Sequence, residues 1–264
     1  MIFAPLVSGS SGNCTYVEAG DVRLLIDAGP SAKRICGLLR EIGVEPSSIG
    51  AILITHEHTD HIGGVAVFSK QYGIPVYANA ETHDAMLLKK AEIPPALVRV
   101  IEPDRVFFIR QARILPFSTQ HDSARSMGYS VMHAGCKCTV MTDTGRVTER
   151  MLEAASGSDV ILIEANHDVE MLKCGPYPAM LKHRILSARG HLSNEDCGTA
   201  LCRLHETGVT NAVLGHLSQE NNTPELARVT VESILQEKGI LGEMRIVVAR
   251  WLEPTGVFRI GEDR

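Results

Sequence analysis

The sequence predicts a single α/β domain, covering residues 1–264, in which sheets and helices pack in layers. Three observations support this fold class. Strand-like and helix-like segments are mixed throughout the chain, as is typical of layered α/β proteins. No linker, low-complexity segment or short repeat divides the sequence. With 264 residues, of which 44% are hydrophobic and 22% charged, the chain can bury a substantial core.

The first half of the chain alternates strands and helices. Gly20 and Asp21 separate two apolar runs and favour a hairpin. Ser31 is a suitable N-cap for the first helix, and Pro94 lies beyond the end of the last helix of this half. The expected elements are strands at 15–18 and 22–27, a helix at 31–41, a strand at 51–55, a helix from about residue 61, a strand at 75–78 and a helix at 81–91.

From residue 105 the pattern changes to consecutive strands, and the last part of the chain alternates again. Strands are expected at 106–109, 112–115, 128–132 and 137–141. They are followed by a helix at 147–155, a strand at 159–164, helices at 178–189 and 194–207, a strand at 211–215, a helix at 224–238 and a strand at 244–249.

The most informative segment follows the predicted strand at 51–55. The sequence His56-Glu57-His58-Thr59-Asp60-His61 places four candidate metal ligands within six residues. Three imidazoles and one carboxylate suit zinc, manganese or iron, and the carboxylate is compatible with a second metal. A strand that ends in such a cluster delivers these side chains to a sheet edge, where a metal can still meet water.

Three further candidate ligands stand where a predicted strand runs into a loop: His121, Asp143 and His216. One edge of a sheet sandwich could collect all of them. Each has an alternative interpretation. The sequence around Asp143, Thr-Asp-Thr-Gly, also favours a turn, and His121 could be a surface loop histidine. His191 competes with His216 for the last ligand position, because both precede Leu-Ser, and the strand that leads directly into His216 favours His216.

These motifs resemble the metallo-β-lactamase fold superfamily. The segment 56–61 matches its HxHxDH motif, and the strand 25–29, His121, the turn 142–145 and His216 follow in the expected order. The resemblance covers nearly the whole chain and implies an αββα four-layer sandwich. Four flanking segments resemble the YycJ/WalJ-type branch of nucleases and phosphodiesterases: Ser8–Asn13, Glu164–Asp168, Gly190–Asp196 and His216–Asn222.

The resemblance implies a site for two divalent metal ions (Zn, Mn or Fe) and exonuclease activity on DNA. Such a pair would make water reactive and hold a phosphoryl oxygen. Asp60 is then expected to orient the attacking water. His191 could contact the substrate phosphate or be a structural residue, and His191 or His216 could stabilise the leaving oxygen. The implied ligands are His56, His58 and His121 for the first metal, and Asp60, His61 and His216 for the second, with Asp143 bridging.

Polar residues near these motifs are candidate substrate contacts. Ser10 and Asn13 could belong to a polar loop over the site or to a turn between two strands. Ser193 and Asn194 begin a predicted helix, in which Ser193 with Asp196 matches an N-cap followed by an acidic first turn. Free N–H groups at that helix start could bind a phosphate.

The composition of the chain limits the classes of function that fit it. With a net charge of −5 the chain has no overall excess of basic residues of the kind that is typical of nucleic-acid-binding proteins. A local basic groove would still be compatible with nucleic-acid binding. No segment approaches the roughly 18 apolar residues of a membrane span, and the N-terminus lacks a signal-peptide pattern. Seven scattered cysteines without a CxxC indicate reduced thiols of a cytoplasmic protein. Nothing in the sequence indicates an oligomeric state.

Three functional hypotheses follow in order of preference. The first is metal-dependent hydrolysis of a phosphodiester, with DNA as the favoured substrate. The second is a small-molecule hydrolase acting on a thioester, a lactone or a cyclic phosphodiester, which the absence of a basic excess favours slightly. The third is a metal-bound regulatory protein without turnover, against which the complete ligand set argues.

Overall fold

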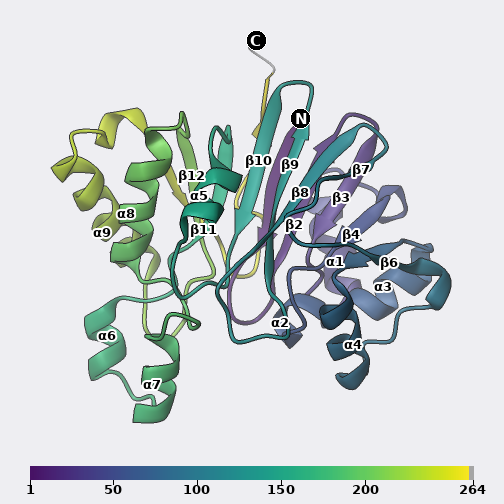
Figure 1. Ribbon diagram of the computed structural model, residues 1–264, viewed down its shortest axis with the longest axis horizontal. Helices are drawn as coiled ribbons and strands as arrows, with labels where there is room; N and C mark the ends of the chain where they lie inside the picture. The colour runs from purple at the N-terminus through teal and green to yellow at the C-terminus, as the bar shows by residue number, and fades with distance from the viewer. Residues whose placement is uncertain (262–264) are drawn as a thin grey trace.

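A computed structural model describes residues 1–261, and its first sheet comes mostly from the N-terminal part of the chain (Figure 1). The strands in sheet order are β14 (Phe258–Arg259), β1 (Ile2–Val7), β2 (Cys14–Ala19), β3 (Val22–Ile26), β4 (Ala51–Leu53), β5 (Val76–Ala78) and β6 (Val98–Val100). The helices of this part are α1 (Ala32–Glu41), α2 (Thr59–Ile62), α3 (Val65–Tyr72) and α4 (Ala80–Leu88), with 3-10 turns at Pro46–Ser48 and Pro95–Leu97.

The second sheet continues the chain from residue 107. Its strands in sheet order are β13 (Arg245–Val248), β12 (Asn211–Gly215), β11 (Val160–Glu164), β10 (Cys136–Met141), β9 (Met127–His133), β8 (Ala112–Ser118) and β7 (Phe107–Ile109). Its helices are α5 (Glu149–Ala155), α6 (Val169–Cys174), α7 (Ala179–Ile185), α8 (Asn194–His205) and α9 (Pro224–Glu237), with a 3-10 turn at Leu241–Glu243.

The two sheets face each other across a central apolar core, and helices cover both outer faces (Figure 1). Buried residues of α1, α3 and α4 pack on the first sheet, and those of α5, α8 and α9 on the second. Tyr129 is fully buried between the sheets, and its hydroxyl donates to the carbonyl of Ile54 at 2.7 Å. That bond joins the sheets directly beside His56. The expected αββα four-layer sandwich is confirmed.

The candidate ligands lie near one another because of how the strands run. Strands β3 to β6 are parallel in the first sheet, and β10 to β13 are parallel in the second. Residues that follow β3, β10 and β12 have left-handed backbone conformations: φ is 62° at Asp27, 57° at Asp143 and 55° at His216. Positive φ is uncommon outside glycine, and such strain persists at sites where the surrounding structure fixes the turn. Polar side chains therefore concentrate at the carboxyl ends of these strands.

The sequence-based expectations for the elements hold for most of the chain, with local differences. Strand β1 was not expected, because Pro5 interrupts its apolar run; the structure accommodates Pro5 beside a register shift between residues 5 and 7. The short elements β6, β14 and α6 were also missed. The helix expected at 178–189 ends at Ile185, and Gly190 lies beyond it in a position without room for a Cβ atom.

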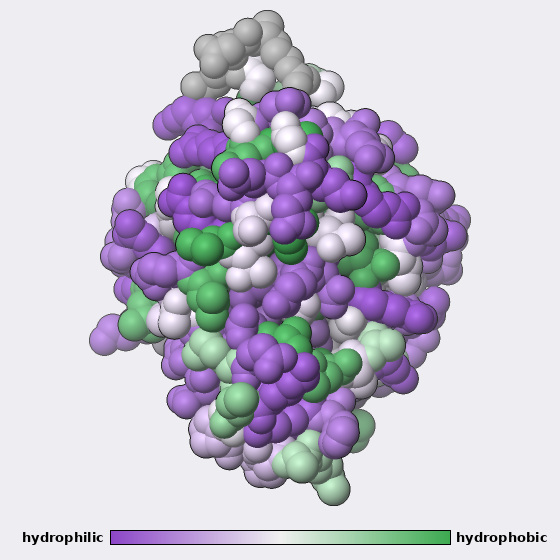
Figure 2. Space-filling view, turned by 90° about the vertical axis from the view of Figure 1, so that its left-hand side faces the viewer, coloured by the Kyte–Doolittle hydropathy of each residue, from purple (hydrophilic) through white to green (hydrophobic). Residues whose placement is uncertain are grey.

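The outer face that carries α8 and α9 is largely hydrophilic, with small, separate hydrophobic patches (Figure 2). This is the surface expected of a helix layer whose opposite side packs on a sheet. Among residues 1–261, no helix combines the length and the apolar character that crossing a membrane requires.

Candidate metal centre

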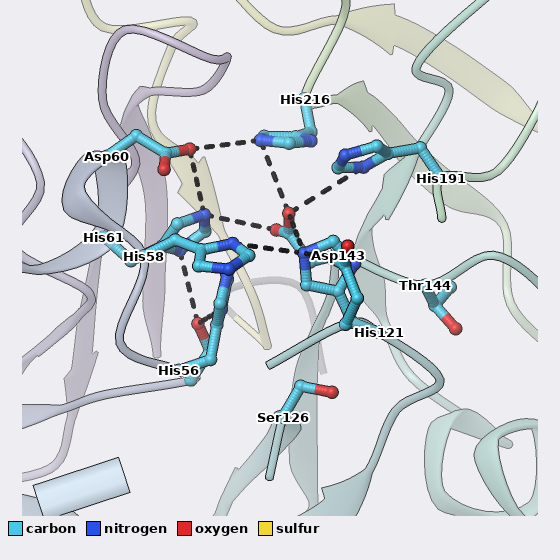
Figure 3. Close-up of polar contacts among 12 residues, drawn as sticks. His56, His58, Asp60, His61, His121, Ser126, Asp143, Thr144, His191 and His216 are labelled. Atoms are coloured by element: carbon cyan, nitrogen blue, oxygen red, sulfur yellow. Dashed lines mark hydrogen bonds and ion pairs between the residues drawn. The ribbon is translucent and has the colours of Figure 1, made fainter. Parts of the chain in front are cut away.

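The first group of candidate ligands is formed by His56, His58 and His121. One ring nitrogen of each lies within 4.8 Å of those of the others. Nδ1 of His58 is 3.3 Å from Nε2 of His121. Nε2 of His56 is buried and has no hydrogen-bond partner among the residues that the structure describes. Figure 3 shows these rings facing one another from the loop after β4 and the loop after β8.

The second group is formed by Asp60, His61 and His216. Oδ2 of Asp60 lies 3.3 Å from Nε2 of His61 and 3.4 Å from Nε2 of His216. His61 and His216 are buried, whereas the Asp60 side chain is 23% exposed. The group therefore joins α2 to the end of β12 and keeps one carboxylate open to solvent.

Asp143 lies between the two groups (Figure 3). Its Oδ2 is 3.2 Å from Nε2 of His61, and its Oδ1 is 3.5 Å from Nε2 of His216 and 3.7 Å from Nε2 of His121. Asp143 also forms a third compact group with His56 and His61. One carboxylate thus contacts both groups, as a bridging ligand would.

A partner behind each buried ring directs its other nitrogen toward the centre. His61 Nδ1 is 2.8 Å from Oδ2 of Asp27, and His216 Nδ1 is 2.9 Å from Oε1 of Glu164. His121 Nδ1 donates to the carbonyl of Gly190 at 2.9 Å. Metal-binding histidines usually donate their second N–H to a carboxylate or carbonyl, so these bonds match that arrangement and direct Nε2 of each ring toward the centre.

Thr55 performs the same task for His56. Its Oγ1 lies 2.9 Å from Oδ2 of Asp27, an acceptor, so the hydroxyl proton is directed there. The same oxygen can then accept from Nδ1 of His56, 3.0 Å away. His56 therefore also presents an unprotonated Nε2 to the centre.

The electrostatics of the site favour charged carboxylates and a neutral His56. Burial, with His61 nearby, lowers the pKa of His56 well below its usual value. Burial alone would raise the pKa of Asp60 and Asp143, but the surrounding histidines outweigh it and lower both pKa values. Metal ions bind neutral imidazoles and ionised carboxylates, so the states of His56, Asp60 and Asp143 suit ligands. Burial alone would lower the pKa of His61 and His216, but the neighbouring carboxylates outweigh it and raise both pKa values well above the usual value, so these two rings must lose a proton to bind a metal ion.

The histidine and aspartate clusters fit divalent metal ions. The orphaned Nε2 of His56 is the clearest sign, because a buried nitrogen without a partner is costly unless something binds it. Imidazole and carboxylate donors accept zinc, manganese and iron alike.

The structure separates the two competing histidines. His216 is 3% exposed, and its Nε2 faces Asp60 and Asp143. His191 is bound to the same glutamate, with Nδ1 2.7 Å from Oε1 of Glu164, but it is 22% exposed and its Nε2 has no partner within residues 1–261. His216 is therefore the more enclosed of the two, and His191 lies at the rim, where it also forms a compact group with Asp143, Glu164 and His216.

Residues 22–217 match the family model described as a beta-lactamase superfamily domain. The chain belongs to this superfamily. It is 42% identical over 237 residues to the exodeoxyribonuclease WalJ of Streptococcus pneumoniae, covering 89% of this chain and 88% of that protein. It is 39% identical over 237 residues to the exodeoxyribonuclease YycJ of Bacillus anthracis, covering 90% of each. The resemblance to the YycJ/WalJ-type branch is therefore confirmed.

Solved structures agree on the fold of this beta-lactamase superfamily member. The metallo-beta-lactamase fold protein YhfI from Bacillus subtilis superposes with a TM-score of 0.72 and 15% identity, covering 98% of this chain and 100% of that chain. The short form of human tRNase Z gives a TM-score of 0.67 and 19% identity, covering 98% and 99%.

Asn13 lies beside Asp60 at the candidate metal centre. Asn13 is buried, its Nδ2 donates to Oδ2 of Asp60 at 3.1 Å, and its Oδ1 accepts from the N–H of Gly9 at 3.0 Å. Gly29 makes room for this contact, since a Cβ there would lie 1.6 Å from the carbonyl oxygen of Asp60. Asn13 thus supports a candidate ligand, and a direct contact with substrate stays a prediction. Ser10, by contrast, is exposed beside His191.

The start of α8 has the N-cap that the sequence suggests. Ser193 is buried and caps the N–H of Asp196 at 3.1 Å, and Asn194 is fully buried with its amide paired to that of Asn222. The acidic side chains of Glu195 and Asp196 lie in the first turn. Ser193 and Asn194 therefore hold the start of α8 in place, and a contact of this helix start with a substrate phosphate stays a prediction.

Sequence reasoning gave no role to Asp27 and Glu164, and named Asn166 only as a residue at a strand end that could line the cleft. Asp27 and Glu164 orient proposed ligands, and Nδ2 of Asn166 donates to the carbonyl of His216 at 2.8 Å. Their sequence signal is the one that identified Asp143: a polar residue at the end of an apolar strand. Glu57 is buried and accepts from the N–H of Ala124 at 2.9 Å.

Proposed function

We propose that this chain is a metal-dependent exodeoxyribonuclease that hydrolyses phosphodiester bonds from the ends of DNA. The observation that carries the proposal is its 42% identity to the exodeoxyribonuclease WalJ over about nine-tenths of both chains. The convergence of His56, His58, Asp60, His61, His121, Asp143 and His216 at one sheet edge supports it.

We assign these seven residues to two cations. His56, His58 and His121 would hold the first, Asp60, His61 and His216 would hold the second, and Asp143 would serve both. When bound, the cations lower the pKa of water and withdraw charge from a phosphoryl oxygen. Residues 1–264 are proposed to act as one hydrolase domain around this centre.

Asp60 and His191 have the geometry for roles in turnover. The Asp60 side chain is 23% exposed while that of Asp143 is 3% exposed, so Asp60 can contact the attacking water. Its lowered pKa makes it a weak proton acceptor, and orienting that water by hydrogen bonding is its proposed role. His191, fixed by Glu164 through Nδ1, directs an unpartnered Nε2 toward the rim, where a phosphate or leaving oxygen would lie.

The test uses the full chain loaded with Mn²⁺ or Zn²⁺. End-labelled linear DNA should be shortened progressively, whereas a closed circular plasmid should survive because it has no end. Asp143→Asn and His216→Ala should lose more than about 100-fold in rate. His205→Ala is the matched control, because His205, at the end of α8, contacts Glu243 of the 3-10 turn Leu241–Glu243, away from the centre.

Failure to cleave linear DNA with any divalent ion would refute the proposal. Hydrolysis of a thioester, lactone or cyclic phosphodiester by the same preparation, with DNA untouched, would establish the small-molecule alternative in its place.

A further inference from the structure

A cavity of about 180 Å³ opens beside His191. One wall is the hairpin formed by α6 and α7, which Figure 1 shows projecting beside the loops at the lower end of the molecule. The opposite edge consists of the loops after β1 and β11. Because His191 borders both this cavity and the candidate metal centre, whatever fills the cavity lies next to the reacting phosphate.

The hairpin supplies an apolar and aromatic wall. Leu181 and Ile185 lie four residues apart on α7 and so face the same side, and Tyr177 precedes this helix. The Tyr177 hydroxyl has no hydrogen bond within residues 1–261. Its contribution to the cavity is therefore the ring itself, which offers a flat surface for stacking.

Asn166 supplies an unpartnered acceptor on the opposite edge. It is 4% exposed, and its Nδ2 donates to the carbonyl of His216. Because a carbonyl can only accept, this bond fixes the amide orientation and assigns the remaining atom as Oδ1. That oxygen has no hydrogen bond in the described chain, although Asn166 lines the cavity. The exposed hydroxyl of Ser10 lies on the same edge.

The charges around the cavity cancel. Asp122 and Arg184 both border it and form an ion pair with each other. The pair leaves no excess positive charge for a phosphate. A neutral, flat group with hydrogen-bonding edges fits this lining better, and a nucleobase is such a group.

We infer that this cavity is a subsite for the terminal base of a DNA strand, stacked on Tyr177, so that the enzyme acts on an unpaired terminal nucleotide. The inference rests on the proposed exodeoxyribonuclease function. The volume supports one base: sites for larger ligands measure about 300–1,000 Å³, and a stacked base pair would not enter 180 Å³.

The cavity is held in a fixed position relative to the centre. Nε and Nη2 of Arg189, which follows α7, donate to the carbonyl of His121 at 3.2 and 2.9 Å. The carbonyl of Gly190 accepts from Nδ1 of the same histidine. A base bound against the hairpin therefore places its phosphate at a defined distance from the proposed ligands.

The test compares single-stranded oligonucleotides that carry either a normal or an abasic terminal nucleotide, at the 5′ or the 3′ end. The wild-type, Mn²⁺-loaded full chain should have a KM about 10-fold to 100-fold lower for the normal strand at the end it attacks, as expected for one stacked base. In Tyr177→Ala the ratio of the two KM values should fall close to one. Tyr177→Phe should retain the wild-type ratio, because it keeps the ring.

Met180→Ala is the matched control, since Met180 lies on α7 but is exposed and does not line the cavity. It should keep the wild-type ratio. A Tyr177→Ala variant that weakens both strands equally, or that leaves the ratio unchanged, overturns the subsite while the exonuclease function stands. A wild-type protein that degrades no DNA overturns both.

Discussion

Glu164 and His216 are joined through Oε1 and Nδ1 at 2.9 Å, and the same oxygen lies 2.7 Å from Nδ1 of His191. One carboxylate thus orients both a proposed metal ligand and the histidine at the rim. Glu164 is fully buried, which by itself would raise its pKa, but His191 and His216 lower that pKa to about 2. The carboxylate stays ionised and keeps both rings in place.

Replacing this carboxylate should weaken metal binding without removing a ligand. Glu164→Gln keeps the size of the side chain but loses the charge that holds Nδ1 of His216. Removing such a partner typically lowers metal affinity about 10-fold to 100-fold, and we expect that loss for one of the two cations. Equilibrium titration with Mn²⁺ against a chelator measures it. Glu149→Gln, on the exposed start of α5, should bind like the wild type, and equal affinities in the two variants would contradict the role of Glu164.

The sequence predicts the candidate ligands better than it predicts the residues that orient them. His56, Asp143 and His216 were found because each follows an apolar strand and carries a group that binds metals. The partners of these residues are harder to predict. That Glu164 serves two histidines depends on β11 lying between β10 and β12, a neighbour relation that only the folded sheet fixes.

Side-chain direction is the second thing that the sequence leaves open. Asn13 and Asn194 are polar residues of the type that often contacts a substrate. In the structure both side chains point inward, Asn13 to Asp60 and Asn194 to Asn222. The amide side chain satisfies a buried polar partner as readily as a ligand, so residue type alone does not separate the two roles. Strand β1 was not expected for a similar reason. Pro5 lies within it beside a local register shift, and the sequence alone does not show that shift.

Arg189 should position His121. Its two hydrogen bonds to the His121 carbonyl fix the loop that carries this proposed ligand. Arg189→Met should lower the affinity for one cation about 10-fold. The affinity of Arg189→Lys should lie between those of the wild type and Arg189→Met, because lysine cannot make two parallel hydrogen bonds. The matched control is Arg203→Met, which removes a two-bond contact to Glu149 elsewhere. If both methionine variants titrate like the wild type, Arg189 has no positioning role.

One thiol of the seven should react rapidly in the native protein. Cys174 is exposed at the end of α6, and the other six cysteines are buried. Burial raises the pKa of Cys14, Cys138 and Cys197, which removes the reactive thiolate. A colorimetric disulfide reagent should therefore titrate about one thiol quickly, and all seven after unfolding. Cys174→Ser should abolish the fast phase; a fast phase that survives this change would show that a second thiol is accessible.

His167 should make the free energy of unfolding decrease as the pH falls below about 6.5. It is 1% exposed, neither ring nitrogen has a hydrogen bond to any part of residues 1–261, and burial lowers its pKa to about 4. Between pH 6.5 and 4 the unfolded chain binds a proton that the folded chain does not, so stability falls as pH falls. The loss approaches about 3 kcal/mol at pH 4. Urea unfolding at pH 7, 6 and 5 should show a smaller decrease for His167→Asn than for the wild type, whereas His183→Asn, which changes an exposed histidine on α7, should follow the wild type. Parallel decreases in all three proteins would mean that His167 is protonated in the folded state.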